Sequence, residues 1–349
     1  MRIAQVSPLY QSVPPRSYGG TERVVSYLTE ELVRQGHDVT LFASGDSKTS
    51  ARLISPCERS LRAMKSQDPI AHHFVEMQMV QDRINEFDII HYHIDYLHYP
   101  FSKLGGTPNV TTLHWRLDQP DLKRLYEVFD DIPVISISNA QRKPQPHIYW
   151  VSTVYHGFPD DLYAYYPDKG DYLAFVGRLS PVKRVDRAIK IAKRTGIKLK
   201  IAGNINPEDE NYFNNHIAWQ LDDPLVEYIG EVNEEQKAEF LGNALCMLFP
   251  IDWPEPFGMV MVESMACGTP VIAFKNGSVE ELIKTGQNGY RVNTIDEAVV
   301  AVENIDQISR LDCRRYFEDN FTVSQMADNY LKSYEALIDR AASRVISFK

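Results

Sequence analysis

Two glutamates with seven residues between them, Glu255 and Glu263, have the spacing that points most directly to chemistry. The intervening Pro256-Phe257-Gly258 predicts a helix that begins at Gly258, with Glu255 just before its first turn and Glu263 near its middle. At about 1.5 Å per residue the two carboxylates are roughly 12 Å apart along the axis, too far for a glycosidase pair. The spacing suits the two ends of a nucleotide sugar, with its diphosphate at the helix start. The alternative is an acidic helix flank plus one unrelated surface glutamate.

A second candidate lies in Gly177-Arg178-Leu179-Ser180-Pro181-Val182-Lys183, directly after an apolar run that predicts a strand. Arg178 and Lys183 are five positions apart and flank a turn, so they could clamp a diphosphate at the edge of a sheet. The cations that follow predict a solvated helix face, with contact to anionic lipid as the alternative. They are Arg184, Arg187, Lys190, Lys193, Arg194, Lys198 and Lys200.

A third candidate is the segment Ser17-Tyr18-Gly19-Gly20-Thr21-Glu22, which follows the first predicted strand and opens a helix. Gly19 and Gly20 would let the backbone approach a ligand closely, and a helix start offers free N–H groups to phosphate. An ordinary strand–helix turn explains the same residues.

Short apolar runs alternate with amphipathic stretches along the chain, a pattern typical of parallel sheets with crossover helices. The pattern restarts after a polar segment rich in Pro and Tyr, at 158–169, which predicts two doubly wound units. We expect strands at 2–7, 38–42, 88–93, 109–113, 133–137, 172–176, 198–201, 226–229, 244–249 and 271–274. We expect helices at 22–35, 60–86, 184–194, 234–243, 259–266, 280–284, 295–304 and 322–340.

Composition excludes several classes of protein. The chain has 349 residues with a formal charge of −10, which disfavours binding to nucleic acid. The four cysteines are far apart and form no C-x-x-C, and no apolar run approaches the roughly 18 residues of a membrane span. The N-terminus shows no signal-peptide pattern, so we expect a cytoplasmic protein with at most peripheral contact with the inner face of a membrane.

Together these segments resemble the family 4 glycosyltransferases, retaining enzymes of the GT-B fold. The resemblance runs along essentially the whole chain. Its motifs are YGGTERVV (18–25), GHDVTLFA (36–43), TTLHW (111–115), SISNAQR (136–142), FVGRLSPVKRVDRAI (175–189), EPFGMVMVESMACGTPVIA (255–273) and EELIKTGQNGYRV (280–292).

The resemblance implies two Rossmann-like α/β domains with doubly wound parallel sheets that face each other across a cleft. Residues 1–157 would bind the acceptor, with the C-terminal helix 322–349 packed back on them, and residues 158–321 would bind the nucleotide sugar. It implies that Glu263 binds the ribose and that Glu255 binds the donor sugar. The other implied contacts are Arg178, Lys183, Gly19, Gly20, Phe257, Gly258, Met259 and Val260 at the donor, and His114 beside the donor sugar and acceptor.

The implied reaction transfers a hexose, with retention, from a nucleoside diphosphate sugar to a hydroxyl of a glycan, a lipid-linked acceptor or a small molecule. UDP and glucose are favoured on family frequency alone. Arg178 and Lys183 would stabilise the leaving diphosphate, and the absence of a D-x-D motif favours a metal-independent enzyme, acting as a monomer or homodimer. The segment 91–98 has two interpretations. His91 and His93 could bind a metal ion, or His93 or Asp95 could lie near the acceptor.

Three alternatives stay open: a non-catalytic two-lobe sugar or nucleotide binder, a sugar-nucleotide epimerase, and a phosphorylase. A glycogen-type phosphorylase would need a pyridoxal phosphate lysine and a far longer chain. Aromatic side chains of the first domain would either stack on the acceptor or pack in the core. These are Tyr10, Tyr18, Tyr92, Tyr96, Tyr99 and Trp115.

Overall fold

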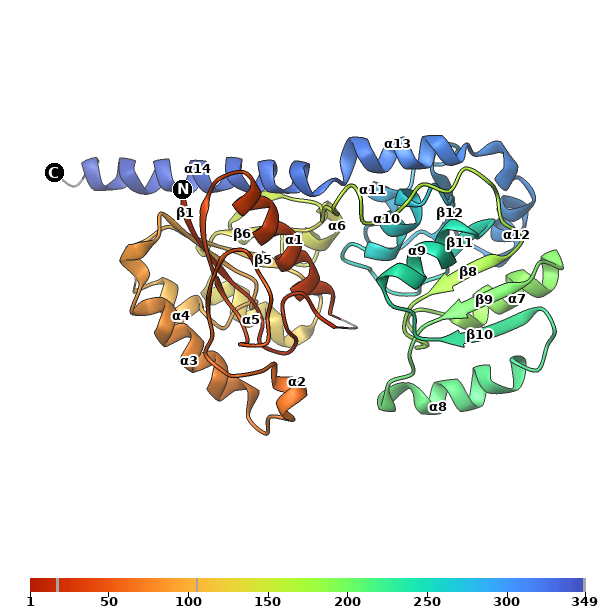
Figure 1. Cartoon of the computed structure of the whole chain (residues 1–349), viewed down its shortest axis with the longest axis horizontal. Helices are drawn as coiled ribbons and strands as arrows, with labels where there is room; N and C mark the ends of the chain where they lie inside the picture. Colours follow the sequence, from red (N-terminus) through yellow and green to blue (C-terminus); the bar gives the residue numbers. More distant parts are fainter. Residues whose placement is uncertain (17–18, 105, 348–349) are drawn as a thin grey trace. The chain divides into compact units, whose positions relative to one another are not determined.

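The structure is a computed structural model that describes residues 1–16, 19–104 and 106–347. It divides into two compact units (Figure 1). Unit 1 is Met1–Pro159 together with the chain from Val323 onward, and unit 2 is Asp160–Thr322. Each unit is built around its own parallel sheet.

The sheet of unit 1 has the strand order β3-β2-β1-β4-β5-β6-β7, with neighbouring strands paired in parallel. The first strand is therefore central, and the order reverses direction between β1 and β4. The core side chains Ile3, Ala4 and Val6 of β1 are fully buried. The strands are β1 (Arg2–Val6), β2 (Asp38–Phe42), β3 (Arg52–Ile54), β4 (Ile89–Tyr92), β5 (Asn109–Leu113), β6 (Val134–Ser136) and β7 (Trp150–Thr153).

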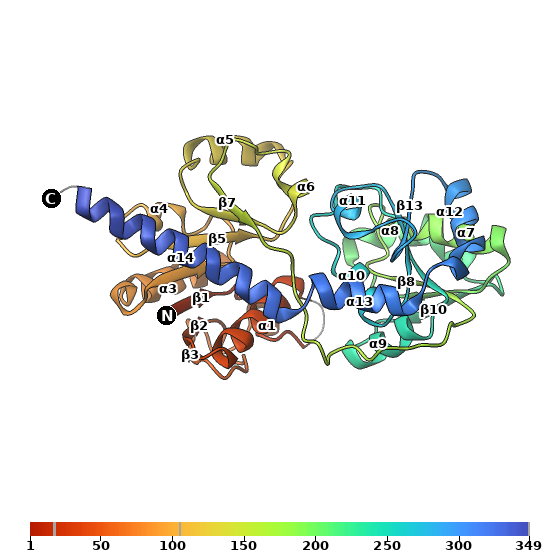
Figure 2. The same ribbon diagram turned by 90° about the horizontal axis from the view of Figure 1, so that it is seen from above.

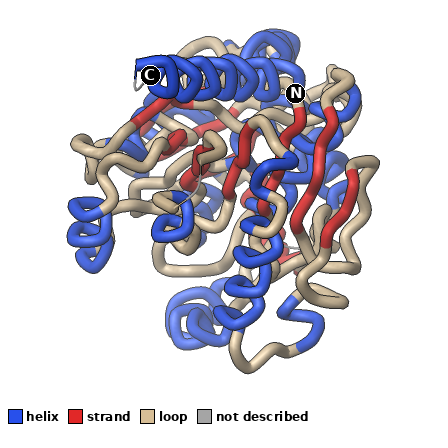
Figure 3. Tube along the Cα trace, turned by 90° about the vertical axis from the view of Figure 1, so that its left-hand side faces the viewer, coloured by secondary structure: helices blue, strands red, loops and turns tan. Residues whose placement is uncertain are grey.

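Helices cover this sheet, and the long C-terminal helix α14 belongs to the same unit (Figures 2 and 3). Tyr330 and Tyr334 lie one turn apart on α14 and are fully buried, and α14 also contacts α1. The N-terminus, where β1 begins, lies beside α14 in both Figure 1 and Figure 3. The helices are α1 (Gly20–Arg34), α2 (Leu61–Met64), α3 (Pro69–Gln81), the 3-10 turn η1 (Ile84–Glu86), α4 (Tyr99–Ser102), α5 (Pro120–Val128), α6 (Asn139–Arg142) and α14 (Val323–Ser347).

The stretch 60–86, expected to be helical, is divided into α2, α3 and the 3-10 turn η1. The chain leaves α2 through Lys65, whose φ of 52° is left-handed, and then starts α3 with Pro69 in the first turn. The Asp68 side chain caps α3 by accepting a hydrogen bond from the Ala71 N–H. Proline lacks an N–H and disfavours a helical residue before it, so Pro69 begins a new helix instead of continuing the old one.

The sheet of unit 2 repeats the same plan, with the strand order β10-β9-β8-β11-β12-β13. Its first strand is again central, and the order reverses between β8 and β11. The strands are β8 (Leu173–Val176), β9 (Leu199–Ala202), β10 (Val226–Gly230), β11 (Cys246–Phe249), β12 (Val271–Phe274) and β13 (Gly289–Val292).

Helix α7 of unit 2 has a strongly one-sided apolar stripe, and its Val185, Ala188, Ile189 and Ala192 are fully buried in the core. The helical segments are α7 (Val185–Thr195), η2 (Pro207–Asp209), α8 (Glu210–Tyr212), the π-helical η3 (Phe213–Ile217), η4 (Ala218–Gln220), α9 (Glu234–Gly242), α10 (Met259–Ala266), α11 (Val279–Leu282), α12 (Ile295–Glu303), η5 (Ile305–Gln307) and α13 (Arg310–Asn320). Among the described residues, no helix combines the length and apolar character needed to cross a bilayer.

Candidate functional site

The loops after β8 and β11 meet at the point where the strand order of unit 2 reverses. The Asp252 N–H donates to the Val182 carbonyl at 2.9 Å, which joins the loop 177–184 to the loop 250–258. In open parallel α/β sheets this reversal point, outside the carboxyl ends of the strands, is where ligands bind. Arg178, Lys183 and Glu255 all lie on these two loops.

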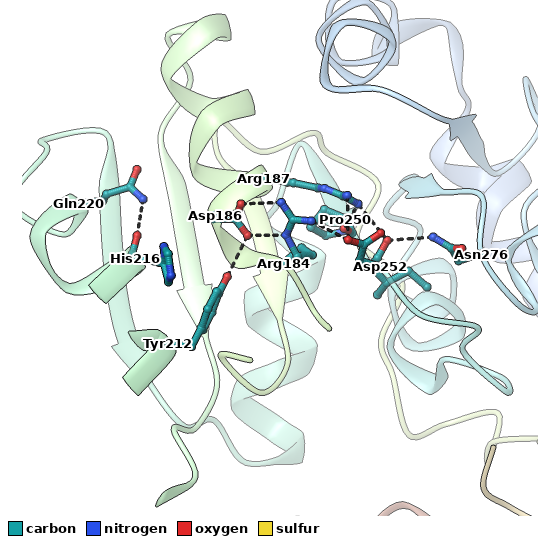
Figure 4. A network of polar contacts seen from close by, with 10 residues as sticks. Arg184, Asp186, Arg187, Tyr212, His216, Gln220, Pro250, Asp252 and Asn276 are labelled. Carbon is teal, nitrogen blue, oxygen red and sulfur yellow. Dashed lines mark hydrogen bonds and ion pairs between the residues drawn. The ribbon is translucent and has the colours of Figure 1, made fainter. Parts of the chain in front are cut away.

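A network of ion pairs beneath the loops holds them together (Figure 4). Arg184 bridges Asp186 at 2.8 Å and Asp252 at 2.7 Å, and Arg187 contacts the same Asp252 carboxylate at 3.1 Å. Arg187 also donates to the Pro250 carbonyl at 3.2 Å. Arg184 has a left-handed φ of 56°, an unfavourable conformation for a residue with a side chain, and its two ion pairs compensate for part of that cost.

Lys183, predicted to bind the diphosphate, and Glu255, predicted to bind the donor sugar, form an ion pair with each other. Trp253 donates its indole N–H to the same Glu255 oxygen at 2.9 Å. The Lys183 ammonium group also lies 5.0 Å from the centre of the Trp253 ring and 5.6 Å from that of Phe249. The aromatic rings restrict where Lys183 can move, which places its charge beside Glu255.

Helix α10 begins at Met259, shortly after Glu255, with Gly258 as its N-cap at a φ of 84°. The carbonyls of Glu255 and Phe257 accept hydrogen bonds from Ser278, from its N–H at 2.9 Å and its hydroxyl at 2.6 Å. These bonds fix the turn that leads into the helix. Met259 and Val260 are half-buried in the first turn of α10, where backbone N–H groups lack intrahelical partners. This geometry suits an anion next to Lys183.

Arg178, on the same loop as Lys183, is held by acidic residues of η2. Its guanidinium lies 3.0 Å from Glu208 and 3.2 Å from Asp209. Burial raises the pKa of Asp209, and the neighbouring Arg178 opposes that rise. Arg178 keeps 32% of its side chain exposed, so it can still reach a ligand.

Glu263, in the middle of α10, is buried and pairs with Lys237 of α9 at 2.8 Å. Lys237 also contacts Glu234, which in turn accepts a hydrogen bond from the Tyr163 hydroxyl at 3.0 Å. Lys237, Trp253 and the acidic partners of Arg178 were not predicted as part of the site. The Asn233 side-chain cap of α9 was readable from the sequence, but its placement of Lys237 against α10 was not.

The remaining predicted residues lie in unit 1. His114 follows β5, and its Nε2 lies 2.9 Å from His93 Nδ1. Gly19 is the N-cap of α1 and Gly20 its first residue. A buried carboxyl group, that of Glu22, lies beside Gly19 and accepts from the Gln11 N–H at 3.2 Å, and burial raises its pKa. Ser17 and Tyr18 lie outside the described residues.

The predicted aromatic acceptor contacts divide into two groups. Tyr92 and Tyr99 are buried in the core and act in packing. Tyr10, Tyr96 and Trp115 are 41%, 41% and 52% exposed, so they lie at the surface of unit 1.

The basic stretch along α7 is largely neutralised within unit 2. Lys193 pairs with Asp223 and Lys198 with Glu227, while Arg194 pairs with Asp296. Paired cations attract anionic lipid less strongly, so α7 lends little support to membrane contact. Among the described residues, including His91 and His93, no group of three or more side chains is placed to hold a metal ion.

Comparison with known proteins identifies the family of the chain. The sequence model described as "Glycosyl transferases group 1" matches residues 166–319, and the one described as "Glycosyltransferase Family 4" matches residues 18–143. An uncharacterized glycosyltransferase of Methanocaldococcus jannaschii is 26% identical over 340 residues, covering 83% of this chain and 84% of that protein.

Two solved structures show the same fold. Sucrose-phosphate synthase from Thermosynechococcus elongatus has a TM-score of 0.80 at 17% identity, covering 97% of this chain and 100% of that one. HepE from Anabaena in complex with UDP-glucose has a TM-score of 0.72 at 17% identity, with the same coverage. The chain therefore belongs to the group 1, family 4 glycosyltransferases and has the GT-B fold. It is a transferase enzyme.

Proposed function

We propose that this enzyme transfers a hexose from a nucleoside diphosphate sugar to a hydroxyl group, with retention at the anomeric carbon. The observation that carries the proposal is the ion pair of Lys183 with Glu255 at the N-terminus of α10. When a diphosphate binds here, its phosphate oxygens replace the Glu255 carboxylate as the partner of Lys183. Glu255 is then released to accept hydrogen bonds from the hydroxyls of the transferred sugar.

Charge builds on the leaving diphosphate as the glycosidic bond breaks. Lys183, Arg178 and the free N–H groups at the start of α10 are preorganised donors that stabilise this charge, so the proposal needs no divalent metal ion. The Glu263 carboxylate accepts hydrogen bonds from the ribose hydroxyls, and Lys237 holds this carboxylate in place. In unit 1, Gly19 and Gly20 approach the diphosphate, and His114 contacts the donor sugar and the acceptor.

The proposed donor is UDP-glucose. The structure of HepE in complex with UDP-glucose, a protein of the same fold, supports this choice. The proposed acceptor is a glycan, a lipid-linked molecule or a small molecule with a free hydroxyl, recognised by unit 1, whose exposed Tyr10, Tyr96 and Trp115 offer flat stacking surfaces. We place the enzyme in the cytoplasm as a monomer or homodimer. Cys57, Cys246, Cys267 and Cys313 are free thiols, consistent with a reducing compartment.

A thermal-shift screen with UDP-, GDP- and ADP-sugars tests the donor. A ligand at 100 times its Kd adds about 2.7 kcal/mol to the stability of the state that binds it, so the true donor raises Tm. The same mixtures are then assayed for slow release of nucleoside diphosphate without acceptor, which a transferase catalyses and a simple binder does not. NMR of the product with an acceptor reads the anomeric configuration. If no sugar nucleotide raises Tm and none is hydrolysed, the proposal is wrong.

A Lys183→Ala variant should abolish the shift and the release, whereas Arg194→Ala should change neither. Arg194 is the matched control because its ion pair with Asp296 lies at the C-terminal end of α7, away from the loops that follow β8 and β11.

A further inference from the structure

A continuous line of hydrogen bonds connects His114 with the C-terminal helix of unit 1. His114 Nε2 lies 2.9 Å from His93 Nδ1, and the other nitrogen of His93, Nε2, lies 2.8 Å from Gln5 Oε1. The Gln5 amide nitrogen donates to the Tyr334 hydroxyl at 3.2 Å. Gln5, His93 and His114 come from the ends of β1, β4 and β5, neighbouring strands in the sheet, so the line crosses three strands.

The line continues beyond Tyr334. The Tyr334 hydroxyl lies 2.6 Å from His91 Nδ1, and His91 Nε2 lies 2.7 Å from the Thr112 hydroxyl. Thr112 then donates to the Tyr330 hydroxyl at 3.0 Å. Gln5, His91, Thr112 and both tyrosines are fully buried. Water therefore does not compete for these groups, and each contact must be satisfied within the line.

The three histidines in this line are neutral near pH 7. Burial lowers the pKa of His91 and of His93 well below its ordinary value, and burial lowers the pKa of His114 to about 3. A neutral imidazole has one N–H donor and one bare nitrogen, so each ring adopts one of two tautomers. The hydrogen bond at one nitrogen therefore decides what the other nitrogen can do.

The orientation of the Gln5 amide sets the direction of the bonds toward His114, and the donation from Thr112 to Tyr330 sets it on the His91 side. Its nitrogen donates to Tyr334, so its oxygen accepts from His93 Nε2–H, and His93 Nδ1 is the bare nitrogen. His114 must then donate from Nε2, which leaves Nδ1 of His114 bare. On the other side the Tyr334 hydroxyl donates to His91 Nδ1, and His91 donates from Nε2 to Thr112. Each contact in the line then has one donor and one acceptor.

His114 Nδ1 is the open end of the line. It is buried and has no hydrogen-bond partner among the described residues. The His156 ring stacks on the His114 ring with centres 5.3 Å apart and planes within 18°, which restricts rotation of His114. A bare, unpaired Nδ1 is an acceptor for a hydroxyl, whereas an Nδ1–H in the same place would be an unsatisfied buried donor, which proteins avoid more strictly.

We propose that Gln5 and His93 are positioning residues that hold His114 as its Nε2–H tautomer, so that Nδ1 accepts a hydrogen bond from a substrate hydroxyl. The substrate in this statement rests on the proposed function. The tautomer itself does not, because it is set in the free protein. The Tyr334 hydroxyl connects Gln5 to α14, so the C-terminal helix contributes to the choice of the His114 tautomer.

Histidine labelled with ¹⁵N tests the tautomer directly, because long-range ¹H–¹⁵N correlation spectra separate a protonated ring nitrogen from a bare one. The His114 signals are identified by their loss in His114→Gln. In the wild-type protein we expect His114 to be protonated at Nε2 and bare at Nδ1. Protonation at Nδ1 in the wild-type protein would overturn the proposal without any variant.

Substitution of Gln5 separates positioning from packing. Gln5→Met keeps the size but breaks both hydrogen bonds, so His114 should become a mixture of tautomers and kcat should fall about tenfold with little change in the KM for the donor. In Gln5→Glu both oxygens accept, so His93 and His114 should keep their tautomers while His91 changes to the Nδ1–H form. A single unchanged His114 tautomer in Gln5→Met would contradict the proposal.

Tyr330→Phe is the matched control for loss of a hydrogen bond to α14. It removes the hydroxyl at the far end of the line and should lower the stability of the protein without changing the His114 tautomer. If the wild-type protein has the expected tautomer but transfers no sugar, the proposed function fails and the tautomer assignment stands. If the wild-type protein transfers sugar with His114 protonated at Nδ1, the proposed function stands and the tautomer assignment fails.

Discussion

The ammonium group of Lys183 contacts the carboxylate of Glu255, residues 72 positions apart on two loops of unit 2. Each group neutralises the other at the start of α10. If Lys183 binds the diphosphate as we propose, a nucleoside diphosphate without its sugar must compete with Glu255 for Lys183, whereas a complete sugar nucleotide would give each group its own partner. On the proposed function, the pair would therefore distinguish the donor from the product that remains after transfer.

Glu255→Gln should separate binding from catalysis. Loss of the negative charge frees Lys183, so affinity for UDP alone should rise or stay unchanged. The carboxylate's charge-assisted hydrogen bonds to the sugar are each worth about 1.5–3 kcal/mol, so kcat/KM for transfer should fall roughly 10- to 100-fold. Calorimetric titration with UDP and steady-state kinetics measure the two effects. Glu280→Gln, an exposed change on α11, is the control. A weaker affinity for UDP in Glu255→Gln would show that Glu255 does not compete for Lys183.

Arg178→Ala should lower the transfer rate by more than its effect on stability accounts for. Removal of one preorganised donor to developing charge costs about 2–4 kcal/mol in the transition state, equivalent to a rate loss of about 30- to 1,000-fold. The ion pair of Arg178 with Glu208 is exposed and contributes about 1 kcal/mol or less to folding. The Asp209 side chain is only 6% exposed, so loss of its cation adds a further cost in stability. Single-turnover kinetics and urea unfolding measure the two quantities. A variant that loses stability but keeps its rate would assign Arg178 a structural role.

The elements around this site were predictable because their local patterns are strong. Helix α10 and strand β12 occur at 259–266 and 271–274, as expected, since glycine and proline separate two apolar runs there. The edge strands β3, β7 and β13 were not predicted. β3 and β7 are short and partly exposed, so neither shows the buried apolar run by which the central strands were identified.

The residue types at the site were also predictable, but their pairings were not. Glu255 and Glu263 were predicted to bind a ligand, and in the structure each contacts a lysine, Lys183 or Lys237, that was not predicted as its partner. Lys237 reaches Glu263 because α9 packs against α10, a tertiary contact that no spacing in the sequence encodes. Local patterns specify the elements, whereas partners distant along the chain depend on how the elements pack.

Gly258→Ala should impair the site as well as the fold. Gly258 has a φ of 84°, and a Cβ there would lie 2.7 Å from Met261 Cε and 3.3 Å from Glu255 Cγ. Gly286 has the same φ of 84° with nothing within 4 Å, so Gly286→Ala is the matched control for the backbone cost alone. Both variants should lose about 1–2 kcal/mol of unfolding free energy.

Crowding around the new Cβ should make Gly258→Ala the less stable of the two variants and should also move Glu255. The donor affinity of Gly258→Ala should therefore fall, while the donor affinity of Gly286→Ala should stay unchanged. Urea unfolding and donor titration of the pair measure this difference. Equal donor affinities in the two variants would mean that the Gly258 turn does not position Glu255.

The stability of unit 1 should fall as the pH drops below about 6.5. Burial lowers the pKa of five histidines in this unit well below its ordinary value, so they stay neutral in the folded protein while the unfolded chain takes up protons. Unfolding then binds protons, and each such histidine lowers the unfolding free energy by about 1.4 kcal/mol for each pH unit below its unfolded pKa, until its folded pKa is reached. These histidines are His91, His93, His98, His114 and His156.

Three buried carboxyl groups of unit 1 act in the opposite direction, and one of them is Glu22, whose pKa is raised by burial. Burial raises the pKa of Glu76 to about 7 and that of Asp95 to about 6. Each therefore holds a proton in the folded state that the unfolded chain has released, and its contribution to stability decreases as the pH rises through that range. Because more histidines than carboxyl groups are shifted, we expect the net stability to decrease toward acid pH.

His98→Gln isolates one of these contributions. His98 is fully buried, pairs with Ser102 at 2.6 Å and stacks on Tyr92 with ring centres 3.7 Å apart. Glutamine keeps hydrogen-bonding capacity but has no proton to gain, so urea unfolding between pH 7.5 and 5.5 should show a slope smaller by about one proton than in the wild-type protein. His147→Gln, at an exposed site, should leave the slope unchanged. Equal slopes in His98→Gln and the wild-type protein would mean that His98 takes up its proton equally in both states, and burial would then not be the cause of the acid sensitivity.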